Sequence, residues 1–75
     1  PQSKMIQAIA RSVYNAVDGG EPESAADAVT WAEMVIETAQ DRGVFTSLMN
    51  AGLVWHNGES VGLTESGFAA YQQLK

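Results

Sequence analysis

Few side chains in this 75-residue sequence could take part in catalysis. His56 is the one histidine, and a lone histidine beside a turn is typical of a surface residue rather than of a general base or metal ligand. No serine has a credible base with an orienting carboxylate, and the glutamates follow no metal-ligand spacing. Gly19-Gly20 lacks the lysine of a phosphate-binding loop. The sequence therefore predicts a protein that is not an enzyme and holds no metal or cofactor.

The composition predicts one small domain spanning residues 1–75. Hydrophobic residues make up 45% of the chain, which is typical of a globular protein. Cysteine is absent, so neither disulfides nor thiolate metal sites can stabilise the fold. The longest apolar stretch, Val29–Ile36, is interrupted by Thr30 and Glu33 and is too short to span a membrane. We expect a cytoplasmic protein with no membrane contact.

The net charge of −5 is concentrated in residues 21–41. This segment has no lysine or arginine, and its carboxylates are Glu21, Glu23, Asp27, Glu33, Glu37 and Asp41. Such a cluster could steer a basic partner toward the protein, or it could be a solvated face that keeps the protein soluble. Both interpretations stay open.

Helical periodicity dominates the first half. The apolar spacing predicts a helix over Ser3–Asp18, stopped by Gly19-Gly20. A second helical pattern lies within Ser24–Ala39. Ser24 is one possible cap, but Thr30 and Glu33 have the spacing of a capping box. We therefore expect a regular helix from Thr30, with Trp31 on its buried stripe and Ser24–Val29 as a helical turn or an earlier extension.

The second half predicts a short helix, a hairpin and a final helix. Arg42-Gly43 interrupts the pattern before a helix over Val44–Ala51. Leu53–His56 and Glu59–Leu63 are the predicted strands, and Asn57-Gly58 is a strong signal for a two-residue turn. This turn would place Trp55 opposite Ser60. Thr64 then caps a helix over Glu65–Leu74.

The second half resembles the winged helix-turn-helix family, through the segments 45–54 (FTSLMNAGLV) and 62–67 (GLTESG) around a hairpin. The fold class is therefore mostly α with a small β-hairpin, in the order helix, helix, helix, hairpin wing, helix. The resemblance implies that Val44–Ala51 is a recognition helix and Asn57-Gly58 the wing tip. Unlike the family, the sequence shows no strand signal between its first two helices.

The resemblance implies DNA binding as one function, in which Arg42, Thr46, Ser47 and Asn50 would contact nucleic acid. Phosphate contacts need cations, yet the chain has only four lysines and arginines. Neither the recognition-helix segment nor the wing contains one, and the wing carries Glu59. A DNA-binding regulator, for which a dimer would help, is thus the alternative function.

The function that we expect is a protein–protein interaction through the wing and the third helix. The candidate residues are Trp55, His56, Phe45 and Met49, with Glu33 and Glu37 steering a basic partner. Trp55 has two predicted environments. It packs over Gly62 into the core, or it is an exposed anchor for the partner. A homodimer stays open.

Overall fold

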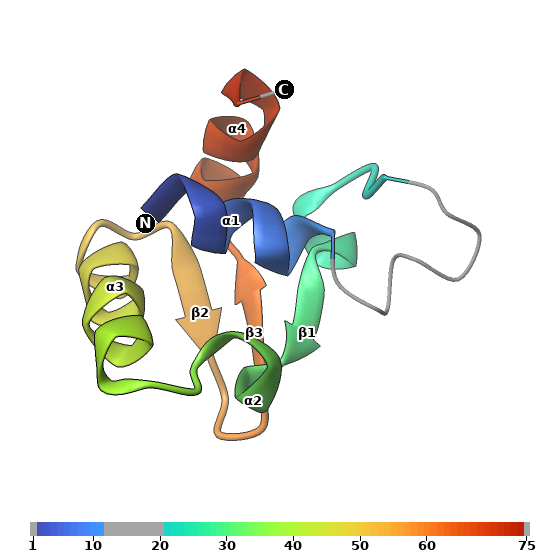
Figure 1. The fold of residues 1–75 in the computed structure, drawn as a ribbon. Helices are drawn as coiled ribbons and strands as arrows, with labels where there is room; N and C mark the ends of the chain where they lie inside the picture. Colours follow the sequence, from blue (N-terminus) through green and yellow to red (C-terminus); the bar gives the residue numbers. More distant parts are fainter. Residues whose placement is uncertain (1, 12–20, 75) are drawn as a thin grey trace.

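The computed structural model describes residues 2–11 and 21–74, which form short helices around a small antiparallel sheet (Figure 1). The elements, in chain order, are α1 (Gln2–Ala10), the 3-10 turn η2 (Ala25–Asp27), β1 (Val29–Trp31), α2 (Ala32–Val35), α3 (Ala39–Asn50), β2 (Val54–His56), β3 (Ser60–Leu63) and α4 (Glu65–Gln73).

The three strands pair in the order β1-β3-β2, so β3 is central. Side chains alternate between the two faces of a sheet. Thr30, Val54 and Val61 lie on the inner face and are at most 5% exposed. Figure 1 shows α1 crossing in front of the sheet and α3 lying beside β2. The rest of the core comes from the helices, through Met5, Ile6, Ile9, Phe45, Leu48, Phe68 and Tyr71.

The predicted hairpin is confirmed, with Asn57-Gly58 in its loop, but the prediction of a two-residue turn was wrong, because the β2–β3 pair nearest the loop is His56 with Val61. The Asn57 side-chain oxygen accepts hydrogen bonds from the backbone N–H groups of Glu59 and Ser60, and Gly58 takes a φ of 102°. These bonds lengthen the loop, so Trp55 pairs with Gly62 rather than with Ser60. Because the register moves by two residues, each side chain keeps its predicted face.

The prediction of a helix from Thr30 was wrong. Thr30 lies in β1 with its Cα opposite that of Val61, and only 1% of it is exposed. Trp31 is the N-cap of α2, which spans only Ala32–Val35. Pairing with β3 gives the backbone of this segment hydrogen-bond partners and buries Thr30, so tertiary contacts outweigh the local capping pattern. The expected absence of a strand before the second helix was therefore also wrong.

The third helix begins earlier than predicted, at Ala39 instead of Val44. Thr38 and Asp41 form a capping box in which the Thr38 hydroxyl accepts from the Asp41 N–H at 3.0 Å and the Asp41 carboxylate accepts from the Thr38 N–H at 3.2 Å. The helix continues through Arg42-Gly43, where a break was predicted, because a single glycine costs only about 1 kcal/mol inside a helix.

The outer helices match their predictions where they are described. The first helix, predicted over Ser3–Asp18, is seen as Gln2–Ala10, and residues 12–20 lie outside the described part of the chain. The predicted cap of the last helix is confirmed. The Thr64 hydroxyl accepts a hydrogen bond from the Gly67 N–H at 3.1 Å and donates one to the Gly52 carbonyl at 2.6 Å.

Candidate binding surfaces

The predicted site residues fall on two different surfaces, and the first joins α3 to the wing. The rings of Phe45 and His56 meet edge to face, with centroids 5.9 Å apart. Phe45 is 5% exposed, so it supports this surface from below and cannot itself be a contact residue. Met49 lies one helical turn after Phe45 on the same side of α3 and is 43% exposed. We call Met49, His56 and the underlying Phe45 the α3–wing surface.

Trp55 belongs to the opposite side of the wing. Its neighbours Val54 and His56 share the inner face of the sheet with Val61, so Trp55 points outward. The half-buried indole lies over Gly62, where an added Cβ would come within 2.5 Å of the ring. Trp55 therefore packs over Gly62, but on the outer face of the sheet instead of in the core. The structure does not bring it together with His56.

Trp31 was predicted to be buried, and this was wrong, because 42% of it is exposed. In the pairing of β1 with β3, Trp31 lies opposite Ser60 and Val29 lies opposite Gly62. These residues share the face of Trp55. We call Val29, Trp31, Trp55, Ser60 and Gly62 the outer sheet face.

The acidic segment has both structural and exposed carboxylates. The Asp41 side chain accepts hydrogen bonds from the N–H groups of Glu37 and Thr38, at 3.3 and 3.2 Å, so it holds the start of α3. Glu33 and Glu37 are exposed, as a steering role requires. They extend from α2 to the residue before the α3 cap.

The residues that the alternative function requires are exposed on α3, namely Arg42, Thr46, Ser47 and Asn50. Arg42 is the single lysine or arginine of this helix. An exposed row of small polar side chains could contact base edges, but phosphate neutralisation would depend on Arg42 alone. This part of α3 therefore exposes polar side chains but only one positive charge.

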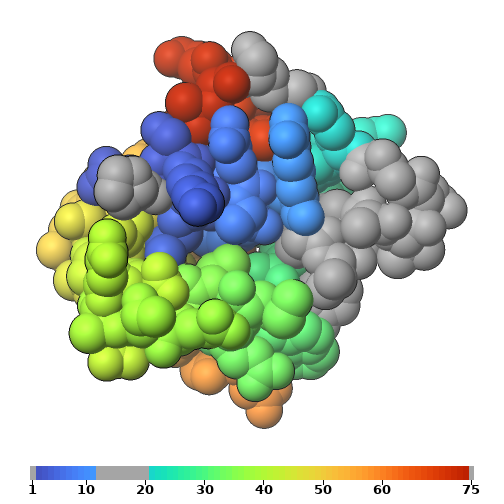
Figure 2. Space-filling view, viewed as in Figure 1, coloured from blue at the N-terminus to red at the C-terminus, as the bar shows by residue number. Residues whose placement is uncertain are grey.

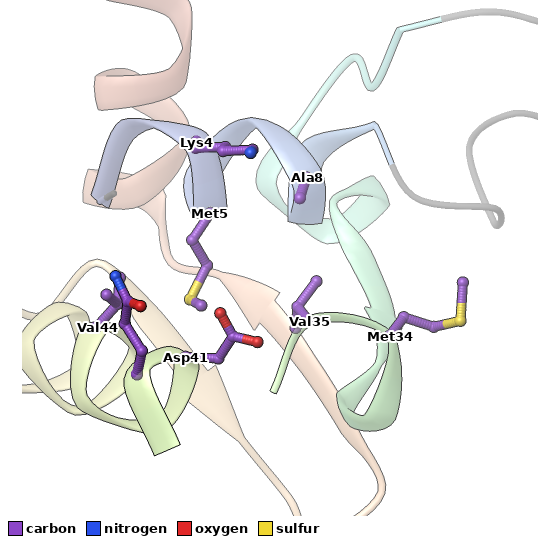
Figure 3. Close-up of a pocket in the computed structure, with 8 residues that line it drawn as sticks. Lys4, Met5, Ala8, Met34, Val35, Asp41 and Val44 are labelled. Carbon is purple, nitrogen blue, oxygen red and sulfur yellow. The ribbon is translucent and has the colours of Figure 1, made fainter. Parts of the chain in front are cut away.

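A cavity of about 510 Å³ lies between α1, α2 and α3 (Figure 3). Figure 3 shows Met5 reaching from α1 toward Asp41 and Val35. In Figure 2, α1 lies next to the segment from α2 to α3 on the face of the molecule that is shown. The lining residues are Lys4, Met5, Ala8, Met34, Val35, Gln40, Asp41 and Val44. The sequence gives no sign of this cavity, because the packing of α1 against α3 leaves no signal in a single segment.

The lining of this cavity is about equally polar and apolar. Methionine and valine side chains supply its walls, with Lys4 and Asp41 as its charged groups. It contains no pairing of a nucleophile with a base. Within residues 2–11 and 21–74, histidines and carboxylates form no group of three or more that could hold a metal ion.

Arg11, at the end of α1, lies apart from these surfaces. Its guanidinium is 3.7 Å from the Glu21 carboxylate. Contact with the Tyr71 hydroxyl, and to a smaller extent the charge of Glu21, raises the pKa of Arg11. These contacts connect the end of α1 to α4 and to the segment before η2, so we assign Arg11 a structural role.

No family profile, curated protein or solved structure matches this chain. Among the described residues, no helix has the length and apolar character needed to cross a membrane.

Proposed function

We propose that this chain is a non-catalytic winged-helix module that binds a protein partner through its third helix and wing. The order of elements supports the winged-helix assignment. With β1 included, the chain reads helix, strand, helix, helix, strand, strand, helix, which supplies the first strand that the sequence lacked. The sheet order β1-β3-β2 is compatible with the same layout. We propose a cytoplasmic location for the module.

The contact between Phe45 and His56 is the observation that carries the proposed function. This contact joins the wing to α3 over a buried ring, and the exposed Met49 lies one helical turn after Phe45. Methionine is flexible and polarisable, which suits it to contacts with a partner of varied shape. A pre-formed surface of this kind loses little conformational entropy when a partner binds.

DNA binding remains the second candidate, because Thr46, Ser47 and Asn50 are exposed on the helix that corresponds to the recognition helix. The charge argues against it. Between Arg11 and Lys75 the only lysine or arginine is Arg42, so the wing and its strands would offer no cation to a phosphate. Non-specific affinity for DNA comes from such cations.

The proposal is tested by comparing two variants that place a charge on an exposed apolar side chain. Met49 lies on the α3–wing surface and is 43% exposed, and Leu74, just after α4, is 38% exposed. The immobilised wild-type chain and the variants Met49→Asp and Leu74→Asp are each used to capture partners from an extract of the source cells. We expect Met49→Asp to lose a protein that the wild type and Leu74→Asp retain. Equal retention by all three chains contradicts the proposed surface.

A further inference from the structure

The loop between β2 and β3 contains an asparagine followed directly by a glycine. In such a pair the side-chain amide is open to attack by the next backbone nitrogen, because glycine has no side chain to shield it and its backbone rotates freely. Asn57 and Gly58 are both exposed. Figures 1 and 2 show this loop projecting at the lower edge of the molecule. Water and hydroxide therefore reach both groups that such a reaction joins.

Two backbone hydrogen bonds hold the Asn57 amide in place. Its Oδ1 accepts from the N–H groups of Glu59 at 3.1 Å and Ser60 at 2.8 Å. The ring that the Glu59 bond closes contains both the Asn57 Cγ and the Gly58 nitrogen, so the side chain is folded over the peptide bond that follows it. The two donors also polarise the side-chain carbonyl, and they stabilise the oxyanion that forms when its carbon is attacked.

The Gly58 nitrogen is not held by a hydrogen bond of its own. Among residues 2–11 and 21–74, no acceptor receives a hydrogen bond from the Gly58 N–H. Asn50, which is also exposed, provides a contrast. The nitrogen that follows it belongs to Ala51, and it donates to the Ser47 carbonyl at 3.0 Å at the end of α3. The structure therefore favours reaction at Asn57 over reaction at Asn50.

We propose that Asn57 is a site of spontaneous covalent modification, at which the Gly58 nitrogen attacks the Asn57 Cγ in the folded protein. The N–H proton passes to hydroxide, and the new N–Cγ bond closes a succinimide ring. The side-chain nitrogen takes up a proton from water and leaves as ammonia. Water then opens the ring at one of its two carbonyls. Opening at Cγ leaves an aspartate with the original backbone, and opening at the main-chain carbonyl leaves an isoaspartate, whose backbone runs through Cβ and Cγ.

The two products have different effects on the wing. Aspartate adds a negative charge and keeps an oxygen for the Glu59 and Ser60 N–H groups, to which a carboxylate is the stronger acceptor. Isoaspartate lengthens the backbone by one carbon and removes the side-chain carbonyl that these N–H groups bind. Because His56 directly precedes Asn57, the isoaspartyl form alters the wing beside the contact between His56 and Phe45. The inference does not depend on the proposed function, since the reaction involves no partner.

The inference is tested by incubating the folded chain in a mildly alkaline buffer and mapping the products by peptide mass spectrometry. We expect Asn57 to be converted to both aspartate and isoaspartate, at a rate that rises in proportion to the hydroxide concentration, while Asn50 stays intact. In the chain unfolded by urea, Asn57 should react no faster than in the folded chain, because unfolding removes the two hydrogen bonds to its Oδ1. Faster reaction in the unfolded chain overturns the inference. So does equal conversion of Asn50, or aspartate as the only product.

Gly58→Ala tests the attacking nitrogen, and Gly43→Ala is the matched control. An added Cβ meets no atom within 4 Å at either position, but Gly58 has a φ of 102°, which strains alanine. We expect conversion of Asn57 to slow several-fold in Gly58→Ala and to stay unchanged in Gly43→Ala, where the substitution lies inside α3. Unchanged conversion in Gly58→Ala overturns the inference, as does equal slowing in both variants.

The comparison of the folded and the unfolded wild-type chain needs no substitution. It therefore tests the inference even where alanine at position 58 displaces the loop. Neither measurement involves a partner, so neither outcome depends on whether Met49→Asp loses a captured protein. Failure of the proposed function and failure of this inference are thus distinguishable.

Discussion

At the scale of single residues, Gly67 has the most demanding environment. A Cβ at this position would collide with the backbone carbonyl of Leu53, which cannot move as a flexible side chain can. Gly67 also donates its N–H to Thr64, so the start of α4 is held against the segment before β2. The close approach of these two backbones fixes where the helix leaves the wing.

Gly67→Ala should lower the free energy of unfolding by about 2–3 kcal/mol, as over-packing of a close contact does. Gly43→Ala is the matched control, because Gly43 lies inside α3 with no atom within 4 Å of an added Cβ. Alanine there should raise stability by up to about 1 kcal/mol. Urea unfolding of both variants checks the pair. A loss at position 43 equal to that at 67 would contradict this account of both glycines.

The face of the sheet on which Trp55 lies could be predicted from the sequence, but its burial could not. The sequence places Trp55 on the face opposite Val54 and Val61, and the structure agrees. The sequence left open whether the indole is buried, because this depends on which elements cover each face of the sheet. In the structure the indole packs over Gly62 and is half-buried. Phe45 was misjudged for the same reason, since His56 and the core cover it from both sides.

At the scale of elements, the capping box of α3 decides where the helix begins. Thr38→Ala removes the acceptor for the Asp41 N–H and should destabilise the fold by about 1 kcal/mol. Thr46→Ala, at an exposed position within α3, should be neutral or slightly stabilising, because alanine is the better helix former. Thermal unfolding of both variants measures the difference. An equal effect at positions 38 and 46 would show that the box does not set the start of α3.

Local signals predicted the second half of the fold better than the segment around β1. The hairpin with Asn57-Gly58 in its loop and the Thr64 cap depend on residues close in sequence, and both are confirmed, although the loop is longer than two residues. Strand β1 depends on pairing with β3, some thirty residues away, while Thr30 and Glu33 happened to match a capping box. The alternation of apolar and polar residues at Val29, Thr30 and Trp31 is a strand signal. It is only three residues long, and the helical pattern that follows it favoured a helix.

At the scale of the whole molecule, helices cover one side of a small sheet and charge is distributed unevenly. The chain offers an α3–wing surface built on Phe45 and an outer sheet face with two tryptophans. Both lie in a protein of net charge −5. The concentration of carboxylates in residues 21–41 could be predicted from the sequence alone. The separation of Trp55 from His56 into two surfaces required the strand register and the burial of each face.

The claim that this module binds protein rather than nucleic acid is tested most directly by an electrophoretic mobility shift with random duplex DNA at low salt. With only four lysines and arginines against nine aspartates and glutamates, few counterions can be released from DNA on binding. We therefore predict no shifted band at protein concentrations up to about 100 µM, the weak limit of ordinary non-specific binding. A micromolar shift that weakens steeply as salt is raised would contradict the account and establish the DNA-binding alternative.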